Sequence, residues 1–145
     1  MEIKLEKIAS NVIDSAFTIH RALGPGLLES VYELLLQKEL EQRGYQVKRQ
    51  HPIPVEFNGL RFDEGFKADL WIDDCFIVEL KSVEKSAPVH SKQLLTYLVL
   101  SKTSLGLLIN FGESLLKDGI KRIVKTSKSS IHKDIISRND ATPQR

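Results

Sequence analysis

The stretch from Phe66 to Lys81, FKADLWIDDCFIVELK, decides the fold of this 145-residue chain. Apolar runs interrupted by charged residues lie on both sides of Asp73-Asp74-Cys75, which is typical of two antiparallel strands joined by a short turn. Because successive side chains of a strand point to opposite faces, Glu79 and Lys81 lie side by side on one face of the second strand. A carboxylate and an ammonium group are thus expected together beside an apolar core.

The position of Asp69 relative to Glu79 depends on the length of the turn. On the first strand, regular alternation places Ala68 and Leu70 on one face and Asp69 on the other. A three-residue turn sets Asp69 directly opposite Glu79, whereas a two-residue turn pairs Asp69 with Val78 and turns its carboxylate away. An odd-numbered turn, or a bulge, is therefore required for any site that the two acids share.

Two carboxylates about 5 Å apart on neighbouring strands repel each other unless a cation lies between them. Mg²⁺ suits such a pair, because it prefers oxygen ligands and keeps several waters beside a substrate phosphate. Lys81 would then orient the attacking water or stabilise the transition state. The combination of Asp69, Glu79 and Lys81 therefore indicates hydrolysis of phosphodiester bonds.

Glu79-Leu80-Lys81 has an alternative interpretation as an ordinary solvated strand face. Acid-x-lysine triplets arise often by chance in a chain with 28% charged residues. Glu2-Ile3-Lys4 has the same spacing without a strand acid upstream. The metal-site interpretation therefore depends on Asp69 and on the hairpin that carries it.

Composition restricts the class of protein. With 145 residues and 41% hydrophobic composition, we expect one compact domain over residues 1–125 and a flexible polar tail over residues 126–145. The net charge of +2 does not by itself indicate nucleic acid. No apolar run approaches the ~20 residues that span a bilayer, so no membrane partner is expected. The single cysteine, Cys75, excludes an internal disulfide and fits a cytoplasmic protein.

Hydrophobic periodicity predicts the order of helices and strands. Helical spacing marks two N-terminal helices separated by the LGPG break at residues 23–26, and a third helix that Ser86 caps and Pro88 begins. Alternating residues mark strands between Tyr45 and Val83, with Asn58-Gly59 as a hairpin turn. The helices are expected at residues 5–23, 27–43 and 88–102, and the later strands at 105–110, buried on both faces, and 120–124.

Two further pairs of polar residues stand out by their positions. Gln93 and Tyr97 are four residues apart, so they share one stripe of the third helix, which would pack back over the sheet. His20 near the end of the first helix and Glu29 at the start of the second flank the LGPG break. Taken singly, these are ordinary boundary residues, or a helix-dipole partner in the case of Glu29. The coincidence of His20 and Glu29 in one corner is more suggestive of a site than either residue alone.

The segment Gly26-Leu27-Leu28-Glu29-Ser30-Val31-Tyr32 reads as G-x-x-E-x-x-Y. With Asp69, Glu79-x-Lys81 and Gln93-x-x-x-Tyr97, the chain resembles the GxxExxY family of the PD-(D/E)xK nuclease superfamily. The resemblance runs from about Ile8 to Val124, and no motif position departs from the pattern.

The resemblance implies an α/β fold with the restriction endonuclease-like core, a mixed β-sheet flanked by helices. It implies Asp69, Glu79 and the Leu80 carbonyl as ligands of Mg²⁺ or Mn²⁺, and Lys81 as the catalytic lysine. The other site residues that it implies are Glu29, Gln93, Tyr97 and, as a further metal ligand, His20. The activity implied is metal-dependent cleavage of nucleic acid, with DNA as the expected substrate.

Two other functions stay open. A catalytically inactive module of the same fold would bind nucleic acid through the basic clusters Lys48–Arg49, Lys81–Lys85 and Lys117–Lys125. A protein-interaction module, including a homodimer formed through a sheet edge or the leucine-rich second helix, would not need the acids or the lysine. Because Asp69, Glu79 and Lys81 are all present, the nuclease is favoured.

Overall fold

The computed structural model describes residues 2–126 of the chain. The elements are α1 Glu2–Leu23, α2 Glu29–Gln42, β1 Val47–Phe57, β2 Leu60–Ile72, β3 Phe76–Lys81, α3 Pro88–Ser101, β4 Leu105–Asn110, α4 Leu116–Gly119 and β5 Ile120–Val124. This order confirms the predicted one and adds the single turn α4. Nearly all of the predicted tail, residues 127–145, lies outside the described residues. Within them, no helix is long and apolar enough to cross a membrane.

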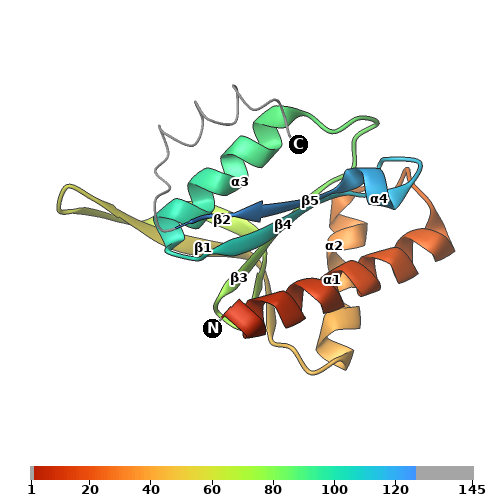
Figure 1. Ribbon diagram of the computed structural model, residues 1–145, viewed down its shortest axis with the longest axis horizontal. Coiled ribbons are helices and arrows are strands. Elements are labelled where there is room, and N and C mark those ends of the chain that lie inside the picture. The colour runs from red at the N-terminus through yellow and green to blue at the C-terminus, as the bar shows by residue number, and fades with distance from the viewer. Residues whose placement is uncertain (1, 127–145) are drawn as a thin grey trace.

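The described strands form one mixed sheet in the order β1-β2-β3-β4-β5. The first three are antiparallel neighbours, β3 and β4 run parallel, and β5 returns antiparallel to β4. A parallel pair cannot be joined by a tight turn, so the chain crosses over through α3. Figure 1 shows α3 on one face of the sheet and α1 and α2 on the other. This arrangement confirms the predicted α/β fold class.

Two apolar cores lie on opposite faces of the sheet. The strand residues of the core under α1 and α2 include Leu70, Ile72, Phe76, Val78, Leu80, Leu107 and Ile109. The core under α3 contains Ile53, Phe66, Ala68, Ile77, Leu94, Leu95, Leu98, Leu108 and Ile123. Every residue of β4 is buried, as predicted for a strand covered on both faces. The central strands β3 and β4 therefore open to solvent only at their ends.

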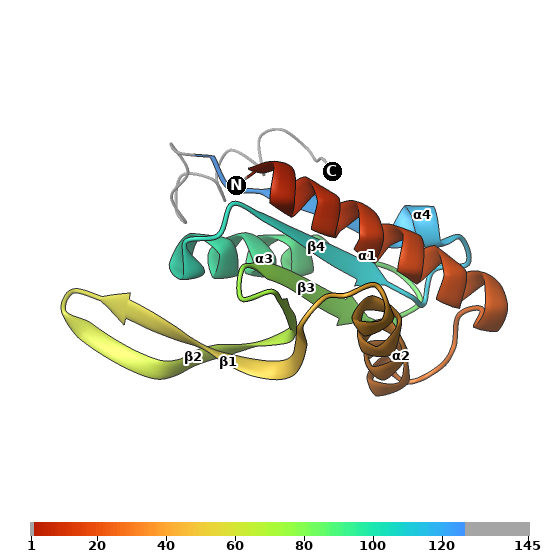
Figure 2. The same ribbon diagram turned by 90° about the horizontal axis from the view of Figure 1, so that it is seen from below.

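The β1–β2 hairpin extends beyond the rest of the sheet as an arm (Figure 2). Asn58-Gly59 forms its turn between the paired residues Phe57 and Leu60, as predicted. Phe57, Leu60 and Phe62 are exposed. They lie on one face of the ribbon, because Phe57 pairs with Leu60 and Val55 with Phe62. The arm thus carries an uncovered apolar face.

Two helix starts and one helix cap differ from the prediction. α1 begins at Glu2 rather than at residue 5. α2 begins at Glu29 rather than at residue 27, because the chain from Gly24 to Leu28 forms a turn of its own. Ser86 does not cap α3: Ala87 holds the cap position and makes no side-chain capping bond. Instead, the N–H and the Oγ of Ser86 both donate to the carboxylate of Glu113 at 3.0 Å. Ser86 therefore ties the loop before α3 to the loop after β4.

Candidate functional site

The turn between β2 and β3 contains three residues, Asp73 to Cys75, because Ile72 pairs with Phe76. Asp73 and Asp74 have φ angles of 50° and 55°, a left-handed conformation that aspartate tolerates better than most residues. The odd-numbered turn that a shared acid site requires is thus confirmed.

Asp69 and Glu79 interlock where the β2–β3 ladder stops. Leu70 and Val78 are the last pair of the ladder. Beyond them, the side-chain carboxylates of Asp69 and Glu79, rather than backbone carbonyls, accept the backbone N–H groups. Oε2 of Glu79 accepts the backbone N–H of Asp69 at 3.0 Å, and Oδ2 of Asp69 accepts the backbone N–H of Leu80 at 2.8 Å. The two acids therefore converge on one place.

Side chains of β2 do not alternate regularly between the two faces of the sheet near Asp69, so the prediction that Ala68 and Leu70 share a face was wrong. Ala68 packs in the core under α3, whereas Leu70 packs in the core under α1 and α2, so the two do not share a face. Gln50 lies across from Asp69 on β1, between the pairs that join residues 49 to 70 and 51 to 68. Its φ of 49° is left-handed. The regular alternation fails where the left-handed conformation of Gln50 changes the direction of β1 opposite Asp69.

Burial and mutual repulsion control the protonation of the two acids. Glu79 is only 8% exposed. Its burial, followed by the negative charge of Asp69, raises the pKa of Glu79 to about 8. Burial also raises the pKa of Asp69, although the hydrogen bond from Leu80 opposes the rise. The pair therefore retains a proton at neutral pH unless a cation takes its place.

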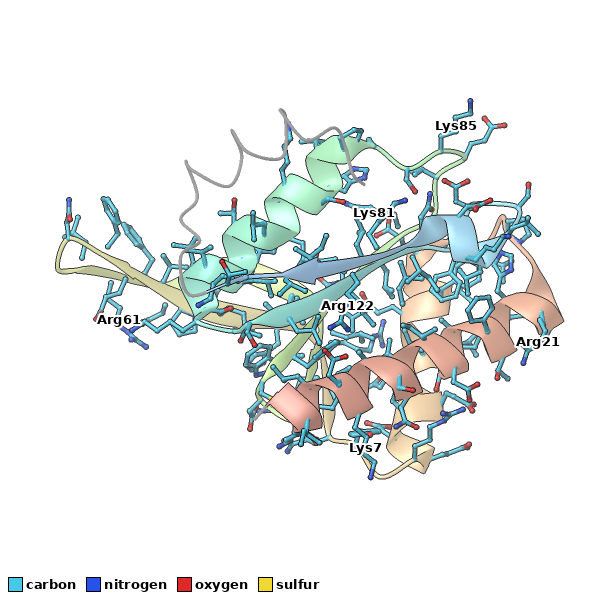
Figure 3. All side chains as sticks on the ribbon, in the orientation of Figure 1. Lys7, Arg21, Arg61, Lys81, Lys85 and Arg122 are labelled. Atoms are coloured by element: carbon cyan, nitrogen blue, oxygen red, sulfur yellow. The ribbon has the colours of Figure 1, made fainter. Side chains whose placement is uncertain are left out.

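Lys81 ends β3 beside these acids. Strand alternation places its side chain on the face of Glu79, and its charge opposes the rise in the pKa of both Glu79 and Asp69. In Figure 3, Lys81 lies at the end of the sheet from which the loop with Lys85 departs. The Leu80 carbonyl points to the β2 side, as its N–H does, since both groups of a strand residue face the same neighbour. The two carboxylates and the charge of Lys81 therefore meet at the end of β3.

The G-x-x-E-x-x-Y segment forms the turn that brings Glu29 to this end of the sheet. The hydroxyl of the fully buried Tyr32 donates to the carbonyl of Gly24 at 2.5 Å and accepts the N–H of Leu27 at 3.2 Å. Glu29 follows as the first residue of α2. Although Glu29 is exposed, partial loss of its hydration raises the pKa of its carboxyl, and the charge of Lys81 opposes that rise. The spacing of the motif is thus explained by a turn locked by a tyrosine.

Tyr97 of α3 also lies near the acids. Its ring stacks on Phe66 with the centroids 3.9 Å apart. Burial, followed by the charges of Glu79 and Asp69, raises the pKa of the Tyr97 hydroxyl. Gln93 is an exposed residue one turn earlier on the same helix. The structure therefore groups Tyr97 with the acids, and places Gln93 on the same helix without a hydrogen bond to them among residues 2–126.

His20 contacts a different part of the molecule. Its Nε2 donates to the backbone carbonyl of Glu113 at 3.0 Å, and its ring lies 6.4 Å from that of Phe111. Within the described residues, no three His, Cys, Asp or Glu side chains lie together as a metal-binding group. Of the three side chains predicted to bind metal, the structure thus brings together Asp69 and Glu79 and places His20 elsewhere.

A family model described as the PD-(D/E)XK nuclease superfamily matches residues 6–123, which is well over half of the chain. The chain belongs to the PD-(D/E)XK nuclease superfamily. No curated protein sequence matches it. In this PD-(D/E)XK chain, the matched region contains all the elements from α2 to β4 and therefore the whole acid site.

Glu33 and Gln50 near the candidate PD-(D/E)XK site were not predicted, and Arg49 was predicted only as part of a basic cluster. Nε2 of Gln50 donates to Oε1 of Glu33 at 2.7 Å and to Oδ1 of Asp69 at 3.1 Å. Nε of Arg49 donates to Oε2 of Glu33 at 2.8 Å. Glu33 was detectable in principle, because it follows Glu29 by four residues and so lies on the same stripe of α2. Nothing in the strand pattern distinguishes Gln50.

An open cavity of about 610 Å³ adjoins the PD-(D/E)XK site. Its walls are Pro25, Gly26, Leu27, Leu28, Glu29, Ser82, Val83, Glu84 and Gly112. The Oγ of Ser82 donates to the carbonyl of Leu27 at 2.5 Å, so the two main walls are joined. The cavity lies beyond the carboxyl ends of the parallel strands β3 and β4, where open α/β sheets commonly bind ligands.

Proposed function

We propose that the protein is a Mg²⁺- or Mn²⁺-dependent nuclease of the GxxExxY family, which hydrolyses phosphodiester bonds of nucleic acid in the cytoplasm, with DNA as the expected substrate. The observation that carries this proposal is the interlocked pair Asp69 and Glu79 beside Lys81, in a chain of the PD-(D/E)XK nuclease superfamily. Asp69, Glu79 and Lys81 are the minimal set of groups for this chemistry.

The donor set fits a hard divalent ion. In this proposal, Asp69 and Glu79 supply carboxylate oxygens, and Leu80 supplies its carbonyl oxygen as a third ligand. Oxygen donors, few in number, suit Mg²⁺, which keeps several waters of its own. Such an ion would offer a water of lowered pKa and would neutralise charge on the phosphate. Its presence would also remove the repulsion that raises the pKa of Glu79.

The surrounding side chains receive separate roles in this proposal. The ammonium of Lys81 orients the attacking water or stabilises negative charge on the phosphate. Glu29 provides a further carboxylate at the helix start, Gln93 contacts a phosphate or water, and Tyr97 supports it. A role for His20 as a metal ligand would have to use Nδ1, because its Nε2 is hydrogen-bonded to a carbonyl.

The cavity beside Glu29 and Lys85 in the adjacent loop are the features that we assign to the substrate strand. Figure 3 shows Lys81 and Lys85 at the same end of the molecule, whereas Arg61 lies on the hairpin arm. Three of the other predicted basic contacts are paired with acids: Lys48 with Asp74 at 3.2 Å, Arg49 with Glu33 at 2.8 Å, and Arg122 with Glu6. Lys85 is therefore the first candidate for contact with the phosphate backbone.

The decisive experiment is cleavage of DNA and RNA substrates by the purified protein with Mg²⁺, with Mn²⁺ and with EDTA. Lys81→Ala should abolish cleavage while the circular dichroism spectrum stays unchanged. Lys38→Ala, which removes an exposed lysine from α2, is the matched control and should cleave normally. Cleavage that resists EDTA, or that persists in Lys81→Ala, would refute the mechanism.

A protein-interaction function, including a homodimer, is favoured by one observation. Phe57, Leu60 and Phe62 expose an apolar face on the projecting arm, and such faces often contact another protein. Sedimentation of the wild type and of Phe57→Ser/Phe62→Ser tests this function. Association that the double substitution abolishes, combined with no response to metal or nucleic acid, would support it over the nuclease.

A further inference from the structure

Gln50 adopts an unusual backbone conformation in the middle of β1. Its φ of 49° lies in the left-handed region, which is unfavourable for a residue with a long side chain and persists where the surroundings enforce it. The conformation changes the direction of the strand: Arg49 reaches Glu33 of α2, whereas the ring of His51 stacks with Trp71 on the other face. The contacts of Gln50 should therefore show what holds its backbone in the left-handed conformation.

The side chain of Gln50 bridges two carboxylates. Its Nε2 donates one hydrogen to Oε1 of Glu33 at 2.7 Å and the other to Oδ1 of Asp69 at 3.1 Å. Both partners only accept, so the amide nitrogen rather than the amide oxygen must face them. A glutamine meets this need without adding charge to a site that already holds two acids.

Glu33 fixes the other end of this bridge to α2. It is 5% exposed, and its second carboxylate oxygen accepts a hydrogen bond from Nε of Arg49 at 2.8 Å. A buried carboxylate held by two donors has little freedom to rotate. The order of contacts is therefore Arg49 to Glu33, Glu33 to Gln50, and Gln50 to Asp69.

We propose that Gln50 is a positioning residue for the divalent-ion site, and that Glu33 holds Gln50 in place. Oδ2 of Asp69 is bound by the Leu80 N–H and Oδ1 by Gln50, so both ends of the carboxylate are held in one orientation beside Glu79. The inference rests on the proposed metal site and extends it, since residues that orient a ligand control affinity without touching the ion.

The first test is Gln50→Gly. Glycine adopts the left-handed conformation without strain, so this change removes the amide and leaves the backbone free to keep its course. The matched control is Lys102→Gly, at the exposed end of α3 with φ of 61° and away from the acids. By calorimetry, Gln50→Gly should bind Mn²⁺ about 10- to 100-fold more weakly than the wild type, and Lys102→Gly should bind it normally.

A second readout does not need the metal. The Leu80 N–H is held by Asp69, so its hydrogen exchange reports whether that carboxylate stays in place. In metal-free protein, exchange at Leu80 should be at least about tenfold faster in Gln50→Gly than in Lys102→Gly. If the wild type fails to bind Mn²⁺, the proposed function fails, and this exchange rate alone decides the positioning role.

Glu33→Gln tests the order of contacts. One amide oxygen cannot replace two carboxylate oxygens, so this variant should weaken Mn²⁺ binding in the wild-type background and add nothing in the Gln50→Gly background. A loss of equal size in both backgrounds would show that Glu33 acts independently of Gln50. Wild-type Mn²⁺ affinity together with wild-type Leu80 exchange in Gln50→Gly would overturn the proposal.

Discussion

Replacing Glu79 by glutamine should remove a large pH dependence from the stability of the metal-free protein. Glutamine keeps the shape of the side chain and an oxygen that accepts the N–H of Asp69, but it cannot ionise. In the wild type, burial and the charge of Asp69 raise the pKa of Glu79 from an ordinary 4.5 to about 8. The folded protein therefore holds a proton that the unfolded chain releases over this interval.

The sign and size of the effect follow from this difference in proton binding. The stabilisation from protonated Glu79 is complete below pH 4.5, declines as the pH rises, and is fully lost above about 8. The slope between these limits approaches ~1.4 kcal/mol per pH unit. From pH 5.5 to 7.5, the free energy of unfolding of the wild type should fall by roughly 2 to 3 kcal/mol relative to that of Glu79→Gln.

Urea denaturation followed by circular dichroism in EDTA, at pH 5.5, 6.5 and 7.5, measures this difference. Glu84→Gln, a change of an exposed acid in the loop after β3, is the control and should follow the wild type. Adding Mg²⁺ at pH 7.5 should stabilise the wild type and not Glu79→Gln, because only the former retains the paired carboxylates. Parallel pH profiles for wild type and Glu79→Gln would refute the account of a buried, mutually repelling acid pair.

Three further outcomes are expected. Mn²⁺ affinity measured by calorimetry should be roughly 50-fold weaker at pH 6 than at pH 8, because the ion must displace the proton that the raised pKa of Glu79 retains; equal heats in Glu79→Ala would contradict the ligand assignment. Tyr32→Phe should lower the free energy of unfolding by about 1 kcal/mol, since the carbonyl of Gly24 loses its donor, and an unchanged urea midpoint would argue against the locked turn. Gly112→Ala places a methyl group 2.2 Å from the carbonyl oxygen of Val83, so it should lower the free energy of unfolding by about 1–3 kcal/mol in the same urea assay. A variant as stable as the wild type would show that this loop can move to accommodate the methyl group.

Local sequence rules predicted much of the fold because the features concerned are local. The turn at Asn58-Gly59 and the buried strand 105–110 were confirmed, since each depends on residues adjacent in the chain. The predicted cap at Ser86 was wrong because it depends on a residue that is distant in the chain. Glu113, distant in sequence, competes successfully for its donors.

The candidate site was likewise predicted only in its local features. The acid spacing and an odd-numbered turn predicted that Asp69 and Glu79 meet, and the structure brings them together. Their detailed geometry depends on Gln50, whose left-handed φ no polarity pattern reveals. Regular alternation therefore misassigned the face of Ala68 relative to Leu70.

By itself, the sequence determined where the two hairpin turns fall and which acids lie within reach of each other, because neighbouring residues control those choices. Only the tertiary structure decided the orientation of the Asp69 carboxylate. That orientation depends on Glu33 of α2, which is 17 residues from Gln50 and reaches it through packing of the helix against the sheet. A hydrogen bond across such a separation exists only after the layers have assembled.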